Sequence, residues 1–280
     1  MRSVTRLLAI AFALIWISGC SPLPTLAEPR IQIAPYLSEY KLRGKTAMDT
    51  FDPAVPSLTR NAQAELTDFG VGDHEDDFGI RGDIGNGFAG LRVDYYRMSA
   101  STSRRGTLPD GWGSLEADDL AGMSTTMDEF RVGYAHELVT AEFDAGDLEN
   151  IGLRLAPGVV LAHRSMSLRA YEETKTRAQA LHAADAGVVY PSLRARLSFR
   201  NFALDAEYAI SPGGFDFGGD FRGLKQDFET RLSYEFEMHD VEMFVGFRRS
   251  EFEINGLEGD QNFSGDFVLD GVQVGIRVGF

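Results

Sequence analysis

One pair of side chains in this sequence could act together in hydrolysis, within the tripeptide His163-Arg164-Ser165. Residues two apart in a β-strand share a face, so His163 could take the proton of the Ser165 hydroxyl. Glu172 or Glu173 could orient the histidine and complete a Ser-His-acid set. A pattern this short also arises by chance, in which case it is an ordinary polar pair on a strand.

A second candidate site is the acidic run from Asp73 to Asp77, which lies near Asp68. Grouped carboxylates can hold Ca²⁺, but the spacing here fits no EF-hand loop, so a solvated acidic loop is the better interpretation of the run. The chain also lacks the motifs of a serine-hydrolase elbow, a zinc protease or a phosphate-binding loop. We therefore predict no metal, no cofactor and no catalysis.

Bulk properties exclude further classes of function. The formal net charge is -15, which excludes nucleic acid as a partner because a phosphate backbone needs a basic surface. Mean hydropathy is -0.17, and no apolar stretch reaches the roughly 18 residues of a membrane-spanning helix. Thirty glycines and twenty phenylalanines with a single cysteine favour a β-barrel over a disulfide-linked secreted module.

The first 27 residues read as an export signal. Arg2 and Arg6 precede an apolar segment, 7–17, that is too short to span a membrane. The segment Ile17–Cys20 resembles a bacterial lipobox, which would make Cys20 a lipidated N-terminus, whereas Ala27 fits cleavage by ordinary signal peptidase. Both cleavage sites remain open, and residues 28–280 form one predicted domain.

Strict alternation of apolar and polar residues dominates the rest of the chain. In 228–238 nearly every second residue is apolar, which is typical of a strand with one apolar and one polar face. The same pattern predicts ten strands, at 31–44, 78–84, 89–96, 129–134, 151–155, 189–199, 202–208, 228–238, 241–247 and 272–280. Composition predicts a short helix over 171–184.

The connections between these strands alternate in length. Long segments at 45–76, 100–123, 166–186, 211–222 and 255–265 alternate with four shorter ones. Short turns on one side and long loops on the other are typical of an outer-membrane barrel. We predict an all-β, antiparallel, up-and-down transmembrane β-barrel of about ten strands. Eight is an alternative, as is twelve if 45–76 holds another hairpin.

The polar faces of the strands carry charges of both signs. A ten-stranded barrel is only slightly wider than one filled by its own side chains, so these charges would pair across the lumen and narrow or close it. The predicted members are Arg81, Asp83, Arg92, Asp94, Glu129, Arg131, Arg154, Arg194, Arg196, Asp205, Glu207, Glu229, Arg231, Glu235, Glu237, Glu242, Arg248 and Arg277.

The last strand, with Val272, Val274, Ile276, Val278 and Phe280, resembles the C-terminal assembly signal of bacterial outer-membrane β-barrel proteins. With the leader and the sorted connections, residues 30–280 resemble the broad OmpA-like class of small barrels. This resemblance implies a Gram-negative outer membrane, contact with its lipid, and assembly by the barrel-assembly machinery through the strand ending at Phe280. A monomer is expected.

Function follows from this resemblance only in outline. We expect an outer-membrane protein of structural or surface-interaction type with a closed or narrow lumen. The first alternative is a lipid hydrolase at the membrane rim that uses His163 and Ser165, since outer-membrane lipid A deacylases carry a similar His-x-Ser element. The second alternative is a narrow, porin-like solute channel.

Overall fold

The computed structural model describes residues 29–52, 55–71, 75–102, 105–145, 148–172, 178–210, 221–236, 240–258 and 261–280. The leader, Cys20 and both predicted cleavage sites lie outside this range. The described chain is almost entirely β-strand, and one 3-10 turn, η2 (Leu66–Phe69), interrupts it. No helix in this part of the chain is long and apolar enough to cross a membrane.

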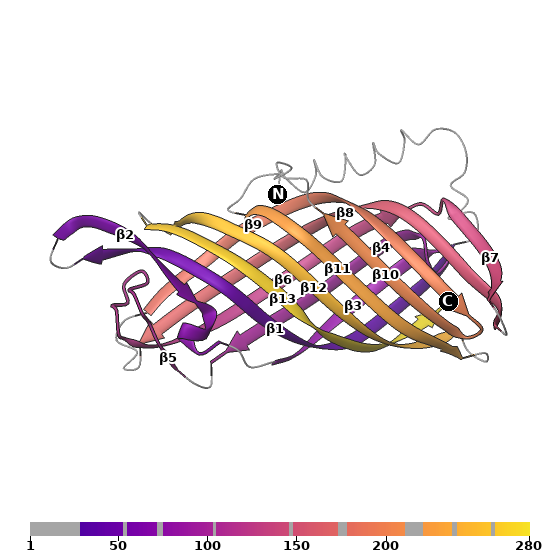
Figure 1. Ribbon diagram of the computed structural model, residues 1–280, viewed down its shortest axis with the longest axis horizontal. Coiled ribbons are helices and arrows are strands. Elements are labelled where there is room, and N and C mark those ends of the chain that lie inside the picture. Colours follow the sequence, from indigo (N-terminus) through magenta and orange to yellow (C-terminus); the bar gives the residue numbers. More distant parts are fainter. Residues whose placement is uncertain are drawn as a thin grey trace.

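Ten strands close into a single antiparallel ring in chain order, because β1 pairs with β13 and β6 pairs with β8 (Figure 1). The ring consists of β1 (Arg30–Asp52), β3 (Glu75–Gly85), β4 (Gly90–Ser101), β6 (Leu120–Ala135), β8 (Leu148–Glu172), β9 (Ala178–Phe199), β10 (Phe202–Ile210), β11 (Phe221–Phe236), β12 (Val241–Glu258) and β13 (Gln261–Gly279). Outside the ring, β2 (Val55–Glu65), β5 (Gly106–Thr107) and β7 (Val139–Ala145) each pair with one strand. The predicted fold class and strand number are confirmed.

The pairing register fixes the tilt and width of the barrel. Paired residues lead from Ser198 around the ring through Ala203, Ser233, Phe244, Gly275, Tyr36, Gly79, Tyr96, Glu129 and Arg164, and return to the starting strand at Ala186. The return is displaced by 198 - 186 = 12 residues, which is the shear of the barrel. With ten strands, this shear implies a strand tilt of about 40° and a backbone radius of about 10 Å.

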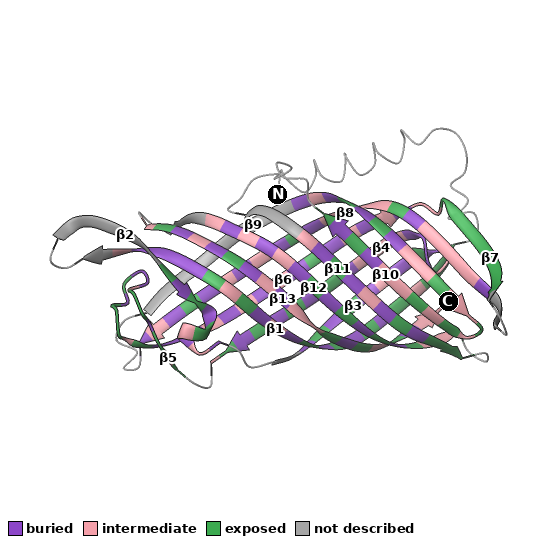
Figure 2. Ribbon diagram, in the orientation of Figure 1, coloured by how far each residue is buried: buried purple, intermediate pink, exposed green. Residues whose placement is uncertain are grey.

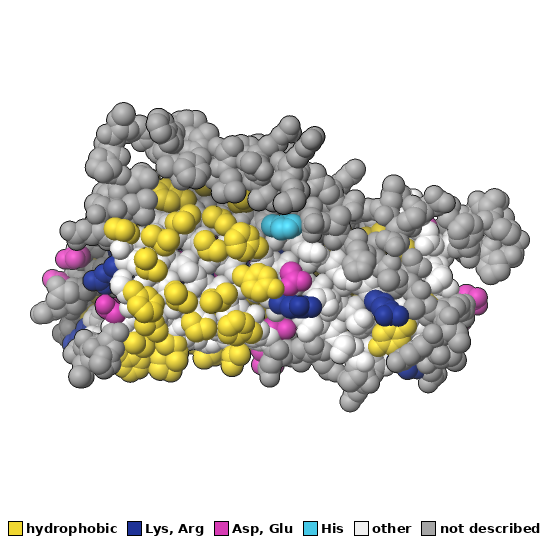
Figure 3. Space-filling view, turned by 180° about the vertical axis from the view of Figure 1, so that it is seen from behind, with side chains coloured by type: hydrophobic (Ala, Val, Ile, Leu, Met, Phe, Trp, Pro, Cys, Tyr) yellow, Lys and Arg dark blue, Asp and Glu magenta, His cyan; other side chains and the backbone are white. Residues whose placement is uncertain are grey.

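An apolar belt surrounds one part of the barrel. Because of the shear, two residues at the same height on neighbouring strands are not paired with each other. Each is offset by just over one residue, along its strand, from the residue that pairs with the other. From His163, a line of constant height passes through the outward-facing Asp128, Arg97, Glu39, Asp270 and Arg249, which we call the polar collar. Below the collar, which means toward the end of the barrel that carries Phe280, nearly all outward residues are apolar, and Thr230 is an exception. Figure 3 shows this hydrophobic surface ending near a histidine and charged groups.

The height of the belt matches a membrane. On β13 it runs from Asp270 to the C-terminal Phe280, and ten residues at this tilt span about 25 Å. That is the height of the lipid-facing band of an outer-membrane barrel. Leu37, Leu232 and Val274 are among the exposed side chains of the belt.

The strands continue well beyond the collar, to Asp52 on β1 and Glu258 on β12. Among the described large apolar residues of this extension, only Leu120 is exposed. Most of its inward residues are apolar and buried, including Met48 and Phe267, and Figure 2 shows buried positions alternating along these strands. The extension is therefore a solid, polar-coated continuation of the barrel.

A mouth plug, formed by η2 and residues 106–115, fills the end of this extension. Trp112 is fully buried, with its ring centroid 5.5 Å from that of Phe69 and 6.3 Å from that of Phe263. Gly106 lies so close to η2 that a Cβ atom there would be 2.1 Å from the backbone oxygen of Asp68. Glycine is therefore required where the two segments of the plug meet.

Several sequence-based boundaries were wrong. The helix predicted over 171–184 is absent from the described residues, where β8 ends at Glu172 and β9 begins at Ala178. Pairing with neighbouring strands overrides a weak helix propensity here. The predicted long loops at 166–186 and 255–265 are mostly strand, and only 259–260 separates β12 from β13. Segment 45–76 does hold a hairpin, but β2 pairs only with β1, so the ring keeps ten strands.

Candidate functional site: an ion-paired lumen

The lumen at the height of the belt is filled by charged side chains from strands on opposite walls. Every cation in the described part of this layer is an arginine, and a guanidinium can bind two carboxylates at once. Strand alternation places these residues inward, because each lies between two outward-facing neighbours. Arg231, for example, lies between Thr230 and the exposed Leu232.

Arg81 ties β3 to the opposite wall. Its Nη1 donates to Glu229 Oε1 at 2.7 Å and its Nη2 to Glu229 Oε2 at 2.9 Å, a bidentate contact with β11. Nη2 also donates to Asp94 on the neighbouring strand at 2.9 Å. Asp94 in turn accepts a hydrogen bond from the Tyr36 hydroxyl at 3.0 Å. All four side chains are buried, so each charge has a partner where no bulk water reaches it.

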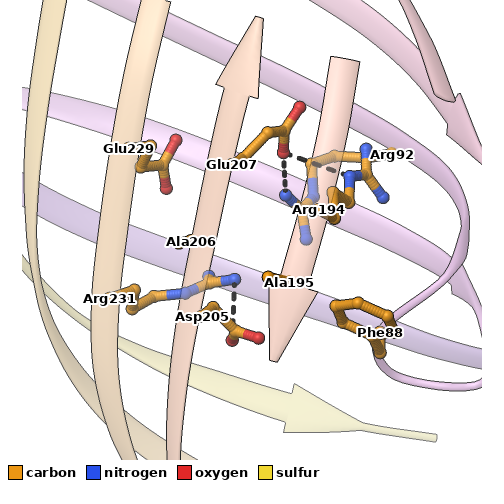
Figure 4. Close-up of a pocket in the computed structure, with 9 residues that line it drawn as sticks. All are labelled: Phe88, Arg92, Arg194, Ala195, Asp205, Ala206, Glu207, Glu229 and Arg231. Carbon is orange, nitrogen blue, oxygen red and sulfur yellow. Dashed lines mark hydrogen bonds and ion pairs between the residues drawn. The ribbon is translucent and has the colours of Figure 1, made fainter. Parts of the chain in front are cut away.

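Glu207 is a second crossing point (Figure 4). Arg92 of β4 donates to it at 2.7 Å from across the lumen, and Arg194 of β9 donates to it at 3.1 Å. Arg92 also donates to Asp83 at 2.7 Å. Three strands that are not all neighbours in the ring are therefore held together by one carboxylate.

The lower end of the layer is paired more loosely. Arg196 donates twice to Asp205, at 2.6 and 2.8 Å, while Arg231 approaches the same carboxylate only to 3.7 Å. The Arg231 guanidinium instead lies over the Phe244 ring, 5.0 Å from its centroid.

At the lowest point of the layer, Arg277 donates to Glu242 at 3.0 Å and lies 4.0 Å from Asp83. Arg277 is nonetheless almost fully buried. The lower lumen is thus occupied by charges even where their pairing is less close.

Glu129 forms the upper tier of the network. It accepts from Arg164 Nε at 2.6 Å and from Arg248 at 2.5 Å, and β6 and β12, which carry Glu129 and Arg248, lie on opposite sides of the ring. Asp227 accepts from Arg248 at 3.2 Å and makes an ion pair with Arg131 at 2.9 Å. Neither Glu129 nor Arg248 has measurable exposure.

Aromatic rings separate this tier from the apolar extension above it. The Arg248 guanidinium lies 4.7 Å from the Tyr96 ring centroid, and that of Arg164 lies 4.3 Å from the Phe252 ring centroid. These cation-π contacts let the charged layer end against the apolar layer.

Almost no open space remains in the network. The two cavities that Arg92, Arg194, Glu207 and Glu229 help to line measure about 10 Å³ each. A volume of that size holds about one water molecule. The arrangement can hold strands together across the lumen, and these two cavities are too small for a solute larger than water.

A separate cluster lies at the lower rim, around Glu137 between β6 and β7. Glu137 accepts from Asn86 Nδ2 at 2.6 Å and from Arg154 Nε at 2.8 Å, and the Thr140 hydroxyl also donates to it. These donors, Arg154 foremost, lower the pKa of Glu137 from an ordinary value of 4.5 to about 2. The Glu137 cluster links the β3–β4 turn to β7 and β8.

Most residues predicted for the lumen lie in this network. The structure brings together Arg81, Asp83, Arg92, Asp94, Glu129, Arg131, Arg194, Arg196, Asp205, Glu207, Glu229, Arg231, Glu242, Arg248 and Arg277. Glu235 is different, because it lies exposed at the lower rim. Arg154 belongs to the Glu137 cluster, and Glu237 lies outside the described residues.

Sequence reasoning missed Arg164 and Asp227. Both have the inward phase, since Arg164 lies between the outward His163 and Ser165, and Asp227 lies two residues before Glu229. Continuing the alternation beyond the predicted strand ends would have found them.

The structure separates the proposed hydrolytic set. His163 faces outward in the polar collar and Ser165 shares that face, but Glu172 is buried on the inward face of the same strand. Nine residues of strand put about 30 Å between His163 and Glu172. The predicted triad with Glu172 was therefore wrong. In the acidic run, residues 72–74 lie outside the described range, and no cluster of possible metal ligands occurs among the residues that are described.

Comparison with known proteins gives only distant likenesses. No family model matches the chain, and no curated protein sequence matches it. Among solved structures, outer membrane protease OmpT from Escherichia coli has a TM-score of 0.47 at 11% identity, over 94% of this chain and 99% of that one. The Pseudomonas putida toluene transporter TodX gives 0.30 at 9%, over 88% and 89%. Ail, the attachment invasion locus protein of Yersinia pestis, gives 0.24 at 9%, over 88% and 97%.

These neighbours are outer-membrane β-barrel proteins, which is the class that the sequence resembles. The likenesses are too distant to carry an argument about activity. The assignment to the barrel class rests on the closed ring, the shear and the belt.

Proposed function

We propose that this protein is a bacterial outer-membrane β-barrel of structural or surface-interaction type, with a sealed lumen and no catalytic role. One observation carries the proposal: at the height of the apolar belt, ion pairs such as Arg81–Glu229 and Arg248–Glu129 connect opposite walls. A protein that transports solute through its lumen would need space there. The cavities of about 10 Å³ support a closed barrel instead.

The orientation follows from the turns. The tight turns 86–89 and 200–201, the start of β1 at Arg30 and the residue Phe280 share the lower rim. Short turns and termini face the periplasm in outer-membrane barrels. The polar-coated extension beyond the collar would then project from the cell and present its surface to partners.

Assembly would use the last strand. The backbone N–H of Phe280 donates to the carbonyl of Ile31 at 2.9 Å, which brings β13 against β1 where the ring closes. The Phe280 side chain is largely exposed at the belt edge. We propose that the barrel-assembly machinery recognises this strand. Cys20, if lipidated, would add an anchor at the same membrane face, and a monomer is sufficient for this role.

Cysteine labelling of intact cells tests the proposal. Lys45→Cys lies beyond the collar and should react with a membrane-impermeant maleimide. Leu232→Cys in the belt and Thr140→Cys at the lower rim should react only after the cells are opened or the protein is unfolded. Labelling of Thr140→Cys but not Lys45→Cys in intact cells would reverse the orientation. Equal labelling of all three would contradict a membrane barrel.

A further inference from the structure

The hairpin of β7 and β8 leaves one strand edge unpaired among the described residues. β4 begins at Gly90, which pairs with Ala135, so β4 does not run alongside β7. β7 pairs only with β8, from Val139 opposite Leu155 to Ala145 opposite Leu148. In Figure 1, β7 is the outermost strand at the right-hand end of the barrel.

This edge projects below the rest of the rim. The line of constant height through Phe199 and Phe280 meets β7 near residue 140, given the shear of 12 residues. The hairpin continues for about five more residues, which at a tilt of about 40° is about 12 Å. In the proposed orientation, the edge lies in the periplasm just below the membrane.

The base of the hairpin is rigid. Glu137 is held by Asn86 of the β3–β4 turn, by Arg154 of β8 and by Thr140 of β7 itself. A partner strand would therefore meet an ordered edge and would not pay for ordering it.

The two faces of β7 differ in chemistry. Val139 and Phe143 are exposed on the face that continues the apolar belt. Thr140, Glu142 and Asp144 alternate with them on the other face and are also exposed, and Figure 2 colours most of this strand exposed. A pairing strand would need apolar side chains on one face and basic side chains on the other.

We infer that β7 is a docking edge for an extended, basic segment of a periplasmic protein, which adds to the sheet as an antiparallel or parallel strand. Backbone hydrogen bonds to the edge would supply affinity, and alternate side chains would supply selectivity. Charge selects against a second copy of this chain, because two β7 strands paired about a twofold axis would place Glu142 and Asp144 among like charges. The inference is independent of whether the lumen is closed.

The test uses the refolded protein in phosphatidylcholine nanodiscs and a fluorescent nine-residue peptide of alternating Val and Lys. Anisotropy should show saturable binding, and empty nanodiscs should show none. The double variant Glu142→Lys, Asp144→Lys should bind roughly tenfold more weakly, because favourable pairs become like-charge pairs. Asp110→Lys, Glu116→Lys, which makes the same charge change at the opposite end of the barrel, should bind as the wild type does.

Backbone pairing is tested separately, with the same peptide N-methylated at every residue, so that neither of its edges keeps an N–H donor. N-methylation removes the N–H donors and keeps the charge, so binding should be lost. Equal binding of the methylated peptide would overturn strand addition. If the Asp110→Lys, Glu116→Lys variant weakens peptide binding as much as the β7 variant does, the peptide is attracted by charge alone and the docking edge is overturned. Absence of peptide binding to the wild-type protein would also overturn it. Unchanged heat-modifiable gel migration of each variant confirms that it has folded.

Discussion

Replacing Glu129 with glutamine should remove the carboxylate on which the upper tier of the lumen depends. Glutamine keeps the shape and one acceptor oxygen but removes the charge. Arg164 and Arg248 then lose their shared carboxylate, and the nearby Asp227 already binds Arg248 and Arg131. Removing one partner of a buried ion pair costs about 3–5 kcal/mol, since the remaining charge stays buried. We expect Glu129→Gln to lower the free energy of unfolding by that amount.

Asp128→Asn provides the matched control. Asp128 directly precedes Glu129 on β6 and has the same charge, but it faces outward. There it accepts a hydrogen bond from the Tyr95 hydroxyl and is partly exposed. Its loss should cost less than about 1 kcal/mol. Urea unfolding in phospholipid vesicles, followed by fluorescence and gel migration, compares the two variants. If Glu129→Gln is no more destabilised than Asp128→Asn, the reasoning that the lumen pairs are buried and interdependent is refuted.

A double variant separates charge from shape. Adding Arg164→Met to Glu129→Gln removes the cation that Glu129 holds, whereas Arg248 keeps its pairing with Asp227. The double variant should recover part of the lost stability, because apolar groups can replace buried ion pairs at little cost. A further loss in the double variant would contradict this account.

Three more predictions concern other layers of the molecule. Gly79→Ala should lower the free energy of unfolding by about 1–3 kcal/mol, because the new Cβ would lie 2.1 Å from the Tyr36 ring. Gly82→Ala should be nearly neutral, because nothing lies within 4 Å of a Cβ there. The midpoints of urea unfolding compare the two variants. Trp112→Ala should cost about 3–5 kcal/mol and make the mouth plug sensitive to protease, and resistance equal to wild type would contradict a packed plug. The lowered pKa of Glu137 contributes stability above about pH 4.5, and this stability is lost as the pH falls toward about 2. Glu137→Gln should therefore flatten the dependence of the free energy of unfolding on pH between these values. An unchanged dependence on pH would refute the role of the Glu137 cluster.

The alternation of apolar and polar residues predicted which residues of the strands face inward, but it could not predict which of them pair across the lumen. The period of two put Arg81, Glu207 and Arg248 on inward faces without any knowledge of contacts, because each follows an apolar, outward-facing residue of its strand. Which carboxylate each arginine binds depends on the shear, and no single strand reveals the shear. The distance between Arg81 and Glu229 is a property of the closed ring.

The predicted strand ends were wrong where the surroundings of the barrel change from lipid to water. Beyond the collar the outward residues of a strand no longer need to be apolar, so the strands continue through 166–172 and 261–269 while the alternation fades. The mouth plug was also not predictable. Trp112 lies in a stretch without regular period, and its burial depends on Phe69 and Phe263, which are distant in sequence.

Planar-bilayer recording of the refolded wild-type protein tests the sealed lumen most directly. Ion pairs such as Arg92–Glu207 and Arg248–Glu129 cross the lumen, and the two cavities that Arg92 and Glu207 help to line hold about one water molecule each. Insertion, verified by heat-modifiable migration of protein recovered from the bilayer, should therefore produce no conductance steps. Reproducible steps from wild-type protein would contradict a closed barrel and would favour a narrow channel.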